Sequence, residues 1–396
     1  MIKSLLKEHV MYLVKNGEIY HRGEFMKKDI LIGGKQILRI ADSIDFEDSL
    51  AIKTIDAAGK KVLPGLIDGH VHICGGGGEG GFKTRTPELK MTDMIRAGVT
   101  TVVGCLGTDG VSRSMEGLVA KMYGLREEGV SAYCYTGSYR LPLKTVTGDI
   151  MKDIMMIEGI IGIGEVAISD HRSAHASRHE FAKAVSDARV AGKLASKCGI
   201  CNVHLGDAQS GLDPILALLK DTAIPITQFL PTHMNRNQHL FDQAIGYAKD
   251  GGYVDFTTST TEAFIEEGEI AAPEAMSRML DAGVPVSRMT LTSDGQGSLP
   301  AFDADGNLTG LTIGSLASLF DAVKSCHDQY GVAFEEVIKT VTENPATILK
   351  LKGKGFLEES YDADILIVDE SFGIETVISM GQLMMFSGEL LVKDTF

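Results

Sequence analysis

The sequence predicts an α/β protein, a (β/α)8 TIM-like barrel with a small β-sandwich domain formed by both chain termini. Between residues 63 and 345, eight apolar, β-branched runs alternate with helix-like stretches, as such a barrel requires. Roughly the first 60 and the last 45 residues instead contain short strands separated by turn signals such as Asn16-Gly17. We therefore expect the small domain to comprise residues 1–62 and 346–396, and the barrel to comprise residues 63–345.

Short apolar runs bounded by turn residues mark the expected strands. In the small domain they are Met11–Lys15, Asp29–Ile32, Gln36–Ile40, Ile52–Ile55, Ala363–Asp369, Ile374–Met380 and Glu389–Val392. In the barrel they are Leu63–Ile67, Thr100–Gly104, Ser131–Thr136, Ile160–Ile168, Asn202–Leu205, Ile226–Thr232, Tyr253–Thr257 and Met289–Thr292. Helical stretches such as Glu180–Lys197 and Pro273–Ala282 separate most of them. The alternative is an open doubly wound sheet, but no G-x-G-x-x-G run opens a helix after the first strand.

Composition limits the possible functions. The net charge of −15 argues against nucleic acid or an anionic membrane as the main partner. No run of about 18 apolar residues occurs, so no membrane span is expected. Charged residues interrupt the first 14 positions, which therefore lack the apolar core of a secretory signal. The six cysteines show no regular disulfide spacing, and we expect reduced thiols and a cytoplasmic location. Cys198 and Cys201 match a redox spacing, but they have no partner pair for a zinc site.

Two histidines, His70 and His72, follow the apolar run 62–67. Residues i and i+2 of a strand point to the same side, so both imidazoles are directed at one point where the strand ends. This arrangement presents two nitrogen ligands to one divalent metal ion. The alternative is a pair of polar residues in a solvated turn. The metal interpretation is favoured because matching residues occur later in the chain.

Further potential ligands lie at the ends of other expected strands. Glu165 lies in the fourth strand, while His204, His233 and Asp294 end or follow the fifth, sixth and eighth. In a parallel barrel these ends share one face, where the active site forms. Four histidines and two carboxylates can therefore converge, which is enough for two metal ions with open positions for water.

These residues resemble the amidohydrolase superfamily. The resemblance covers the whole chain and is carried by Gly65-Leu-Ile-Asp-Gly-His-Val-His72, the histidines ending strands five and six, the aspartate ending strand eight, and the closing segments Asn344-Pro345-Ala346 and Tyr361-Asp362-Ala363-Asp364. Within the superfamily the chain is most similar to the isoaspartyl dipeptidase (β-aspartyl peptidase) family. The segments that carry this narrower resemblance are Gly75–Glu79, Gly137-Ser138-Tyr139, Ile168–Ser173, Pro231–Arg236 and Gly295–Ser298.

The resemblance implies a metal-dependent hydrolase that cleaves dipeptides linked through the aspartate side chain. It implies two divalent metal ions, with zinc expected, a metal-bridging hydroxide, and a homo-oligomer. His70, His72 and Asp294 are implied as ligands of one metal, and His204 and His233 as ligands of the other. Asp294 is also implied as the proton shuttle, and Tyr139 as the stabiliser of the oxyanion. The implied substrate-binding residues are Gly77, Glu79, Thr108, Arg172, Arg236 and Ser298.

The charge pattern agrees with such a substrate. An isoaspartyl dipeptide offers one ammonium group and two carboxylates, which Glu79, Arg172 and Arg236 would complement. Each of these residues, however, could instead be a solvated surface charge, and Tyr139 could be a core tyrosine. His171, His175 and His179 have metal-like spacing, but we expect them in a loop and at a helix start.

Strand four departs from the family pattern. A lysine carboxylated by carbon dioxide usually bridges the metals there, whereas this chain has Glu165. A glutamate supplies a bridging carboxylate of the same charge on a shorter stem, so we expect Glu165 to bridge the metals without carbon dioxide. Alternative functions are hydrolysis of cyclic amides or N-acyl amino acids, and a scaffold without catalysis. The retained histidines and Asp294 argue against the scaffold.

Overall fold

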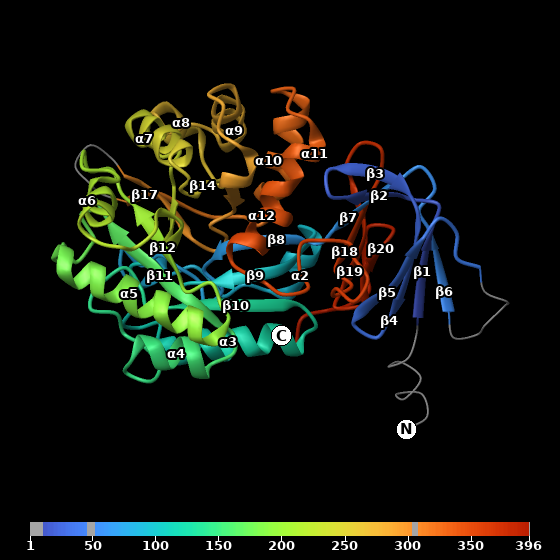
Figure 1. Ribbon diagram of the computed structural model, residues 1–396, viewed down its shortest axis with the longest axis horizontal. Helices are drawn as coiled ribbons and strands as arrows, with labels where there is room; N and C mark the ends of the chain where they lie inside the picture. Colours follow the sequence, from blue (N-terminus) through green and yellow to red (C-terminus); the bar gives the residue numbers. More distant parts are fainter. Residues whose placement is uncertain (1–10, 46–51, 303–307, 396) are drawn as a thin grey trace.

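The computed structural model describes residues 11–45, 52–302 and 308–395. Figure 1 shows a large α/β body on one side and a β-rich body on the other. Residues 1–10, on which the expectation of no secretory signal largely depends, lie outside the described residues. Among the residues that are described, no helix combines the length and the apolar character needed to cross a membrane.

Eight parallel strands form the barrel, as predicted. Six of them make one sheet in the order β13-β12-β11-β10-β9-β8, and the other two make a second sheet, β14-β15. The strands are β8 (Leu66–Val71), β9 (Val99–Gly104), β10 (Ser131–Thr136), β11 (Ile160–Ile168), β12 (Ile200–Leu205), β13 (Phe229–Thr232), β14 (Val254–Thr257) and β15 (Met289–Thr292). The predicted (β/α)8 fold is therefore confirmed, with strand boundaries that shift by a few residues.

Polar contacts close the barrel where the two sheets meet. Val71 pairs with Gly295 in parallel, and the His72 amide donates to the Gly295 carbonyl at 2.9 Å. On the other side, the buried Asp255 carboxylate of β14 accepts hydrogen bonds from threonine hydroxyls of both neighbouring strands. These hydroxyls belong to Thr232, Thr290 and Thr292, each at 2.6 Å. A buried carboxylate satisfied in this way ties β13, β14 and β15 together.

Helices surround the barrel (Figure 1). They are α2 (Met91–Arg96), α3 (Met115–Glu127), α4 (Ile150–Met156), α5 (Arg178–Ala195), α6 (Asp213–Asp221), α7 (Gln238–Lys249), α8 (Glu262–Glu266), α9 (Ala272–Asp281), α10 (Ala317–Asp328), α11 (Phe334–Val337) and α12 (Glu343–Ile348). Short 3-10 helices are η1 (Phe82–Thr84), η2 (Ile226–Gln228), η3 (Val286–Arg288) and η4 (Ile338–Val341).

Helix α5 shows how the local sequence sets an element. Ser177 and Glu180 form a capping box, so the helix begins two residues before the predicted start at 180. Its buried residues, Phe181, Ala184, Val185, Ala188 and Ala191, recur at helical spacing and face the barrel. The helix ends at Ser196, which adopts a left-handed conformation.

The barrel interior is closed at the amino-terminal ends of its strands. Residues near the strand starts, such as Ile67, Ile161 and Leu230, form one buried cluster with Ala346 and Leu349. Helix α12 and the residues after it therefore fill this end of the barrel. The opposite end, where the parallel strands finish, is left for polar side chains.

The first barrel strand differs from the prediction. The chain forms two strands here, β7 (Lys61–Pro64) in the small domain and β8 in the barrel, instead of one strand over 63–67. Gly65 separates them, and a Cβ at this position would lie 2.3 Å from the Thr100 hydroxyl. The close approach at Gly65 and the fixed φ of Pro64 explain the break. His70 therefore lies within β8 and His72 directly after it.

The sixth barrel strand is shorter than predicted. Residues 226–228 form η2 and only 229–232 extend as β13. Pro225 precedes this turn and pre-sets a backbone angle that suits its start.

Both termini contribute to the small domain, as predicted. One sheet has the order β5-β4-β1-β6, and the other the order β21-β20-β19-β18-β7-β2-β3. The strands are β1 (Met11–Lys15), β2 (Glu18–His21), β3 (Glu24–Lys27), β4 (Asp29–Gly33), β5 (Gln36–Ala41), β6 (Ile52–Asp56), β18 (Ile365–Val368), β19 (Ile374–Ser379), β20 (Gln382–Phe386) and β21 (Glu389–Leu390). Strands β2, β3 and β20 were not predicted, because each is short and lacks a clear apolar alternation.

The seven-stranded sheet has two buried faces. Ile365 and Ile367 pack with residues of the four-stranded sheet, whereas Leu366 and Val368 join the cluster that includes the barrel. Successive residues of a strand point to opposite faces, so this sheet is both one layer of the sandwich and the support of the barrel. A hairpin of β16 (Ser298–Phe302) and β17 (Leu308–Ile313) stands apart from both domains' sheets.

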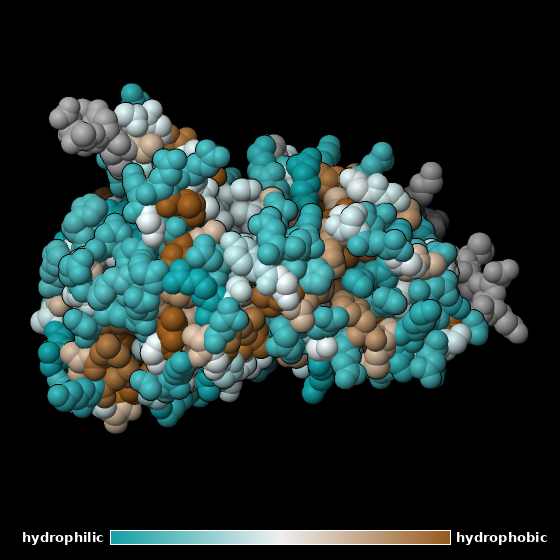
Figure 2. All heavy atoms as spheres, turned by 90° about the horizontal axis from the view of Figure 1, so that it is seen from above, coloured by the Kyte–Doolittle hydropathy of each residue, from teal (hydrophilic) through white to brown (hydrophobic). Residues whose placement is uncertain are grey.

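Lys354 links the two bodies. Its ammonium contacts the carboxylates of Asp364 at 2.6 Å and Asp362 at 2.9 Å, and the hydroxyl of Ser131 at the start of β10 at 2.5 Å. The outer surface is mostly hydrophilic on the face that Figure 2 shows, and the hydrophobic patches there are small and scattered.

Candidate metal centre

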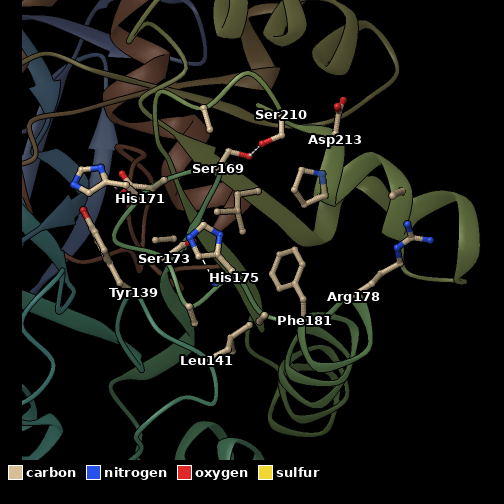
Figure 3. A pocket seen from close by; sticks show the side chains of 18 residues that line it. Tyr139, Leu141, Ser169, His171, Ser173, His175, Arg178, Phe181, Ser210 and Asp213 are labelled. Atoms are coloured by element: carbon tan, nitrogen blue, oxygen red, sulfur yellow. Dashed lines mark hydrogen bonds and ion pairs between the residues drawn. The ribbon is translucent and has the colours of Figure 1, made fainter.

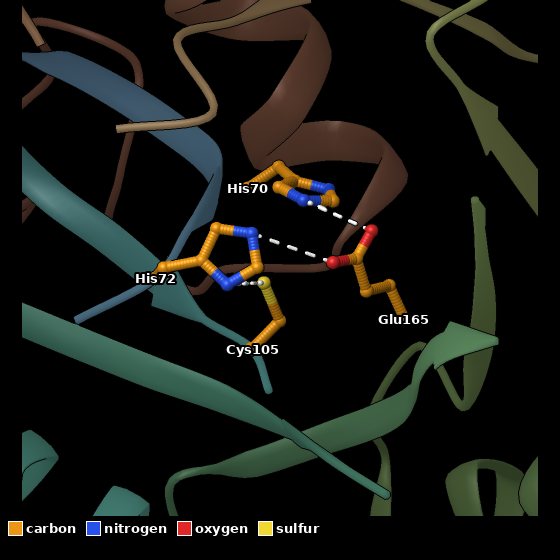
Figure 4. Close-up of side chains that lie close together, drawn as sticks. All are labelled: His70, His72, Cys105 and Glu165. Atoms are coloured by element: carbon orange, nitrogen blue, oxygen red, sulfur yellow. Dashed lines mark hydrogen bonds and ion pairs between the residues drawn. The ribbon is translucent and has the colours of Figure 1, made fainter. Parts of the chain in front are cut away.

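The predicted ligands converge at the carboxyl-terminal end of the barrel. His70 comes from β8 and Glu165 from β11, while His72, His233 and Asp294 lie just beyond strand ends and His204 lies near the end of β12. All are buried. Figure 4 shows His70 and His72 directed at the two oxygens of Glu165.

The Glu165 carboxylate lies at the centre of this group. One of its oxygens, Oε2, is 3.3 Å from His70 Nε2, 3.2 Å from His204 Nδ1 and 3.9 Å from His233 Nε2. The other, Oε1, is 3.4 Å from His72 Nε2. Asp294 Oδ1 lies 3.0 Å from His72 Nε2 and 3.5 Å from His70 Nε2. Two sets of potential ligands therefore share Glu165, one with His70, His72 and Cys105 and one with His204 and His233.

The donor set fits metal ions. Both ring nitrogens of His70, Oε1 of Glu165 and Oδ1 of Asp294 are buried and have no hydrogen-bond partner within the described part of the chain. Buried polar atoms are nearly always satisfied, and imidazole and carboxylate groups are the ligands that zinc and similar divalent ions take. The residues therefore fit metal binding in two groups that share Glu165.

Other side chains hold the ring nitrogens that face away from Glu165. His233 Nδ1 lies 2.6 Å from the Thr257 hydroxyl, and His204 Nε2 lies 3.1 Å from Asp170 Oδ2. His72 Nδ1 faces the buried Cys105 thiol at 3.9 Å. Such contacts orient a ligand ring and select the nitrogen that remains free. His204 would thus bind through Nδ1, and His72 and His233 through Nε2.

The backbone at two of these positions is strained. His233 and Asp294 have φ values of +61° and +51°, in a region that residues other than glycine rarely adopt. The buried Asp68 accepts hydrogen bonds from the His70 amide and from Ser293, next to Asp294. Asp68 therefore joins the backbone at His70 to the segment that precedes Asp294.

The electrostatics favour ionised carboxylates and a neutral His233. Burial opposes ionisation of Glu165, but His70, His204 and His233 hold its pKa well below the usual value. Burial likewise opposes ionisation of Asp294, but His72 and His70 lower its pKa to about 2. Burial lowers the pKa of His233 to about 3, so this ring is neutral and can donate its lone pair to a metal.

A cavity of about 1060 Å3 opens above this centre. All the predicted substrate-binding residues line it, including Gly77 and Arg236. The Glu79 carboxylate contacts three of the other predicted substrate-binding residues. The Thr108 hydroxyl donates to it at 3.0 Å, the Ser298 hydroxyl donates at 3.3 Å, and Arg172 Nη1 lies at 3.5 Å. Residues from three loops and from the start of β16 thus form one polar wall of the cavity.

The two arginines differ in their partners. Arg172 donates from Nε and Nη2 to Asp170 at 2.9 and 2.7 Å, so only Nη1 is turned to the cavity wall with Glu79. Arg236 has one long contact, 3.9 Å from Nε to the exposed Asp207. Of the two, Arg236 therefore keeps the larger share of its donors for a bound carboxylate. Tyr139 also lines the cavity, and its hydroxyl lies 2.9 Å from His204 Nδ1.

A second cavity, of about 610 Å3, lies beside α5 and α6 and is shown in Figure 3. Its walls include Tyr139, Asp170 and His175. His171 is exposed, His175 lies in a loop and His179 in the first turn of α5, so these histidines lie where the sequence places them. None of the three belongs to a metal-like cluster within the described residues.

Three residues of the centre were not predicted from the sequence. Asp170 stands two positions before Arg172, and an acid so close to an arginine after a predicted strand was an available signal. Thr257 is a polar residue at the end of β14, so the rule applied to the other strands could have found it. Cys105 follows β9 within an apolar run, and no sequence pattern distinguished it from a core residue.

Comparison with known proteins agrees with this architecture. The model of the amidohydrolase family matches residues 61–384. The chain belongs to the amidohydrolase family. It is a hydrolase, as the sequence resemblance predicted.

Two solved structures of a β-aspartyl dipeptidase from the thermophilic keratin-degrading Fervidobacterium islandicum AW-1 are similar over nearly the whole chain. The first, in complex with the dipeptide β-Asp-Leu, is 42% identical, has a TM-score of 0.90, and aligns with 98% of this chain and 100% of its own. The second is 40% identical with a TM-score of 0.87 and the same coverage. The predicted resemblance to the isoaspartyl dipeptidases is thereby confirmed.

A curated relative, a dihydroorotase of Staphylococcus aureus (strain MRSA252), is 43% identical over 106 residues. That match covers 27% of this chain and spans only 24% of the relative's length. It therefore supports the family and carries less weight for the substrate.

Proposed function

We propose that this amidohydrolase cleaves isoaspartyl dipeptides with two divalent metal ions, zinc being the expected metal. The main support is the Glu165-centred group of buried histidines below a cavity whose wall carries Glu79, Arg172 and Arg236. The dipeptidase of 42% identity supports the same substrate class.

The charge distribution of the cavity suits a dipeptide with free termini. Glu79 offers a carboxylate to the substrate ammonium group, and Thr108 and Ser298 hold it by hydrogen bonds. Arg236 offers its guanidinium to a carboxylate, and Arg172 offers Nη1. These contacts would place the side-chain amide of the aspartyl residue over the metal centre.

Bound metal ions would lower the pKa of water and polarise the amide carbonyl. His70, His72 and Asp294 would hold one ion, His204 and His233 the other, and Glu165 both. Asp294 is ionised, so it can accept a proton from the attacking water and pass it to the leaving amine. Tyr139, whose pKa burial raises well above 10, keeps its proton and can donate a hydrogen bond to the developing oxyanion.

The test is hydrolysis of β-Asp-Leu and α-Asp-Leu by zinc-loaded protein, with a chelated sample as the control. We expect cleavage of the β-linked peptide alone, and its loss on chelation. Glu79→Gln is the matched variant: it should raise KM for β-Asp-Leu without changing metal content. Cleavage of neither peptide by protein that holds two metal ions would refute the substrate and leave the hydrolase.

The bridging role of Glu165 has its own test. Glu165→Ala should bind fewer than two metal ions per chain. Added carbon dioxide should not change the metal content of the wild type. Full loading of this variant, measured by metal analysis, would contradict the bridge.

A second candidate is hydrolysis of a cyclic amide, because part of the chain resembles a dihydroorotase. The charged wall of the cavity favours a zwitterionic dipeptide over a ring with few charges. Turnover of dihydroorotate but not of β-Asp-Leu would reverse this order. The homo-oligomer and the cytoplasmic location remain predictions; all six cysteines are free thiols.

A further inference from the structure

We propose that Asp170 is a positioning residue that joins the metal centre to the substrate-binding wall, because its one carboxylate holds His204 and Arg172 together. This inference rests on the proposed function only for the role of Arg172. The metal part of it stands on the histidine geometry alone.

Asp170 is placed to serve both groups. It lies two residues after the end of β11, its side chain is 2% exposed, and it packs against Gly206 after β12. Oδ1 accepts from the Arg172 amide at 2.7 Å and from Arg172 Nε at 2.9 Å. Oδ2 accepts from Arg172 Nη2 at 2.7 Å and lies 3.1 Å from His204 Nε2. A buried carboxylate paired with an arginine fork is a strong and rigid contact.

The contact with His204 selects the nitrogen that can bind a metal. Both ring nitrogens of His204 face a carboxylate, Nδ1 facing Glu165 at 3.2 Å and Nε2 facing Asp170 at 3.1 Å. The Tyr139 hydroxyl also lies 2.9 Å from Nδ1, and Arg172 Nη2, which donates to Asp170, lies 3.2 Å from Nε2. A neutral imidazole carries one proton, and a nitrogen that binds a metal cannot carry it. Glu165 lies within the cluster of potential ligands and Asp170 lies outside it, so the proton belongs on Nε2. Asp170 thus keeps Nδ1 free.

Arg172 depends on the same carboxylate. Two of its three nitrogens are bound to Asp170, which directs the remaining Nη1 to Glu79 and the cavity. The guanidinium also lies over the Tyr139 ring, 5.3 Å from its centroid. A change at Asp170 would therefore move a metal ligand and the polar wall at the same time.

Asp170→Asn separates this role from simple packing, because it keeps the size and removes one acceptor. The amide nitrogen at the Oδ2 position would face Arg172 Nη2 and His204 Nε2, so three donors would meet. His204 would have to place its proton on Nδ1, which removes the nitrogen that binds the metal. Turning the amide would relieve His204 but would set the amide nitrogen against the Arg172 backbone amide and Nε, so Arg172 would be displaced instead.

The experiment is zinc titration against a competing chelator, with histidine 15N NMR and kinetics on β-Asp-Leu. For Asp170→Asn we expect the affinity for one of the two ions to fall about 10- to 100-fold and KM to rise. The NMR of the metal-free protein should show His204 protonated on Nδ1. Arg172→Met should raise KM and leave zinc affinity within about 2-fold of wild type.

Asp153→Asn is the matched control, since Asp153 is a buried aspartate that binds hydroxyls and amides of the 136–147 segment away from the cavity. It should leave zinc affinity unchanged. Unchanged zinc affinity in Asp170→Asn would overturn the proposal. A loss of affinity for both ions that is the same in Asp170→Asn as in the control Asp153→Asn would also overturn it. If wild type fails to cleave β-Asp-Leu, the proposed function fails, but the zinc and NMR results still decide the role of Asp170.

Discussion

Replacement of Lys354 by methionine should destabilise the protein without disturbing its metal centre. Methionine keeps most of the volume of lysine and removes the ammonium that contacts Asp364, Asp362 and Ser131. Asp364 is 7% exposed, so the change leaves one buried carboxylate without its cation. Asp362, at 24% exposed, can turn to water and adds little.

The expected loss follows from this difference. Removing one partner of a buried ion pair costs about 3–5 kcal/mol. Asp364 keeps the hydrogen bond from the Met380 amide at 2.7 Å, so we expect a value near the lower limit, about 3 kcal/mol. Urea unfolding followed by circular dichroism measures it, with Lys28→Met as a control on the exposed Lys28–Asp42 pair, where a much smaller loss is expected because solvent screens the pair.

Metal binding should remain, since Ser131 begins β10 at the barrel end opposite the ligands. The double variant Lys354→Met/Asp364→Asn should regain part of the lost stability because the buried charge is gone. A loss below about 1 kcal/mol in Lys354→Met would refute the view that this lysine couples the two domains.

Three further outcomes are expected. Tyr139→Phe should lower kcat for β-Asp-Leu by about 10²- to 10³-fold with unchanged metal content, and equal kcat would exclude the hydroxyl from catalysis. Thr257→Val should weaken zinc binding by about 10-fold in a chelator competition, because His233 Nδ1 loses its partner; wild-type affinity would show that Thr257 does not orient the ring. Burial raises the pKa of Asp255 to about 6, above its unfolded value near 4, so its stabilising effect is complete below pH 4 and is lost as the pH rises through 6. Asp255→Asn removes this titration. Between pH 4 and pH 7, the free energy of unfolding of the metal-free variant should therefore fall by about 3 kcal/mol less than that of the metal-free wild type. Parallel curves of unfolding free energy against pH for the two proteins would contradict this.

Local sequence was enough to predict the barrel and the histidines and carboxylates that converge at its carboxyl-terminal end. Strand and helix periodicity is a property of neighbouring residues, so the eight strands could be located within a few positions. The i, i+2 spacing of His70 and His72 sets their common direction, and the parallel topology places polar residues after different strands on one face. Where local signals conflicted, as at Pro64-Gly65, the boundary shifted because Gly65 has to pass close to Thr100.

The partners of the ligands were decided only by the tertiary structure. Asp170 and His204 are 34 positions apart, and they meet because β11 and β12 pair in one particular register. The same holds for Asp255, which gathers three hydroxyls from two neighbouring strands, and for Cys105 behind His72. Strand register follows from the packing of the whole barrel, which no short segment specifies. The sequence by itself therefore determined which polar side chains meet at one end of the barrel, and the fold determined which other side chains hold them in place.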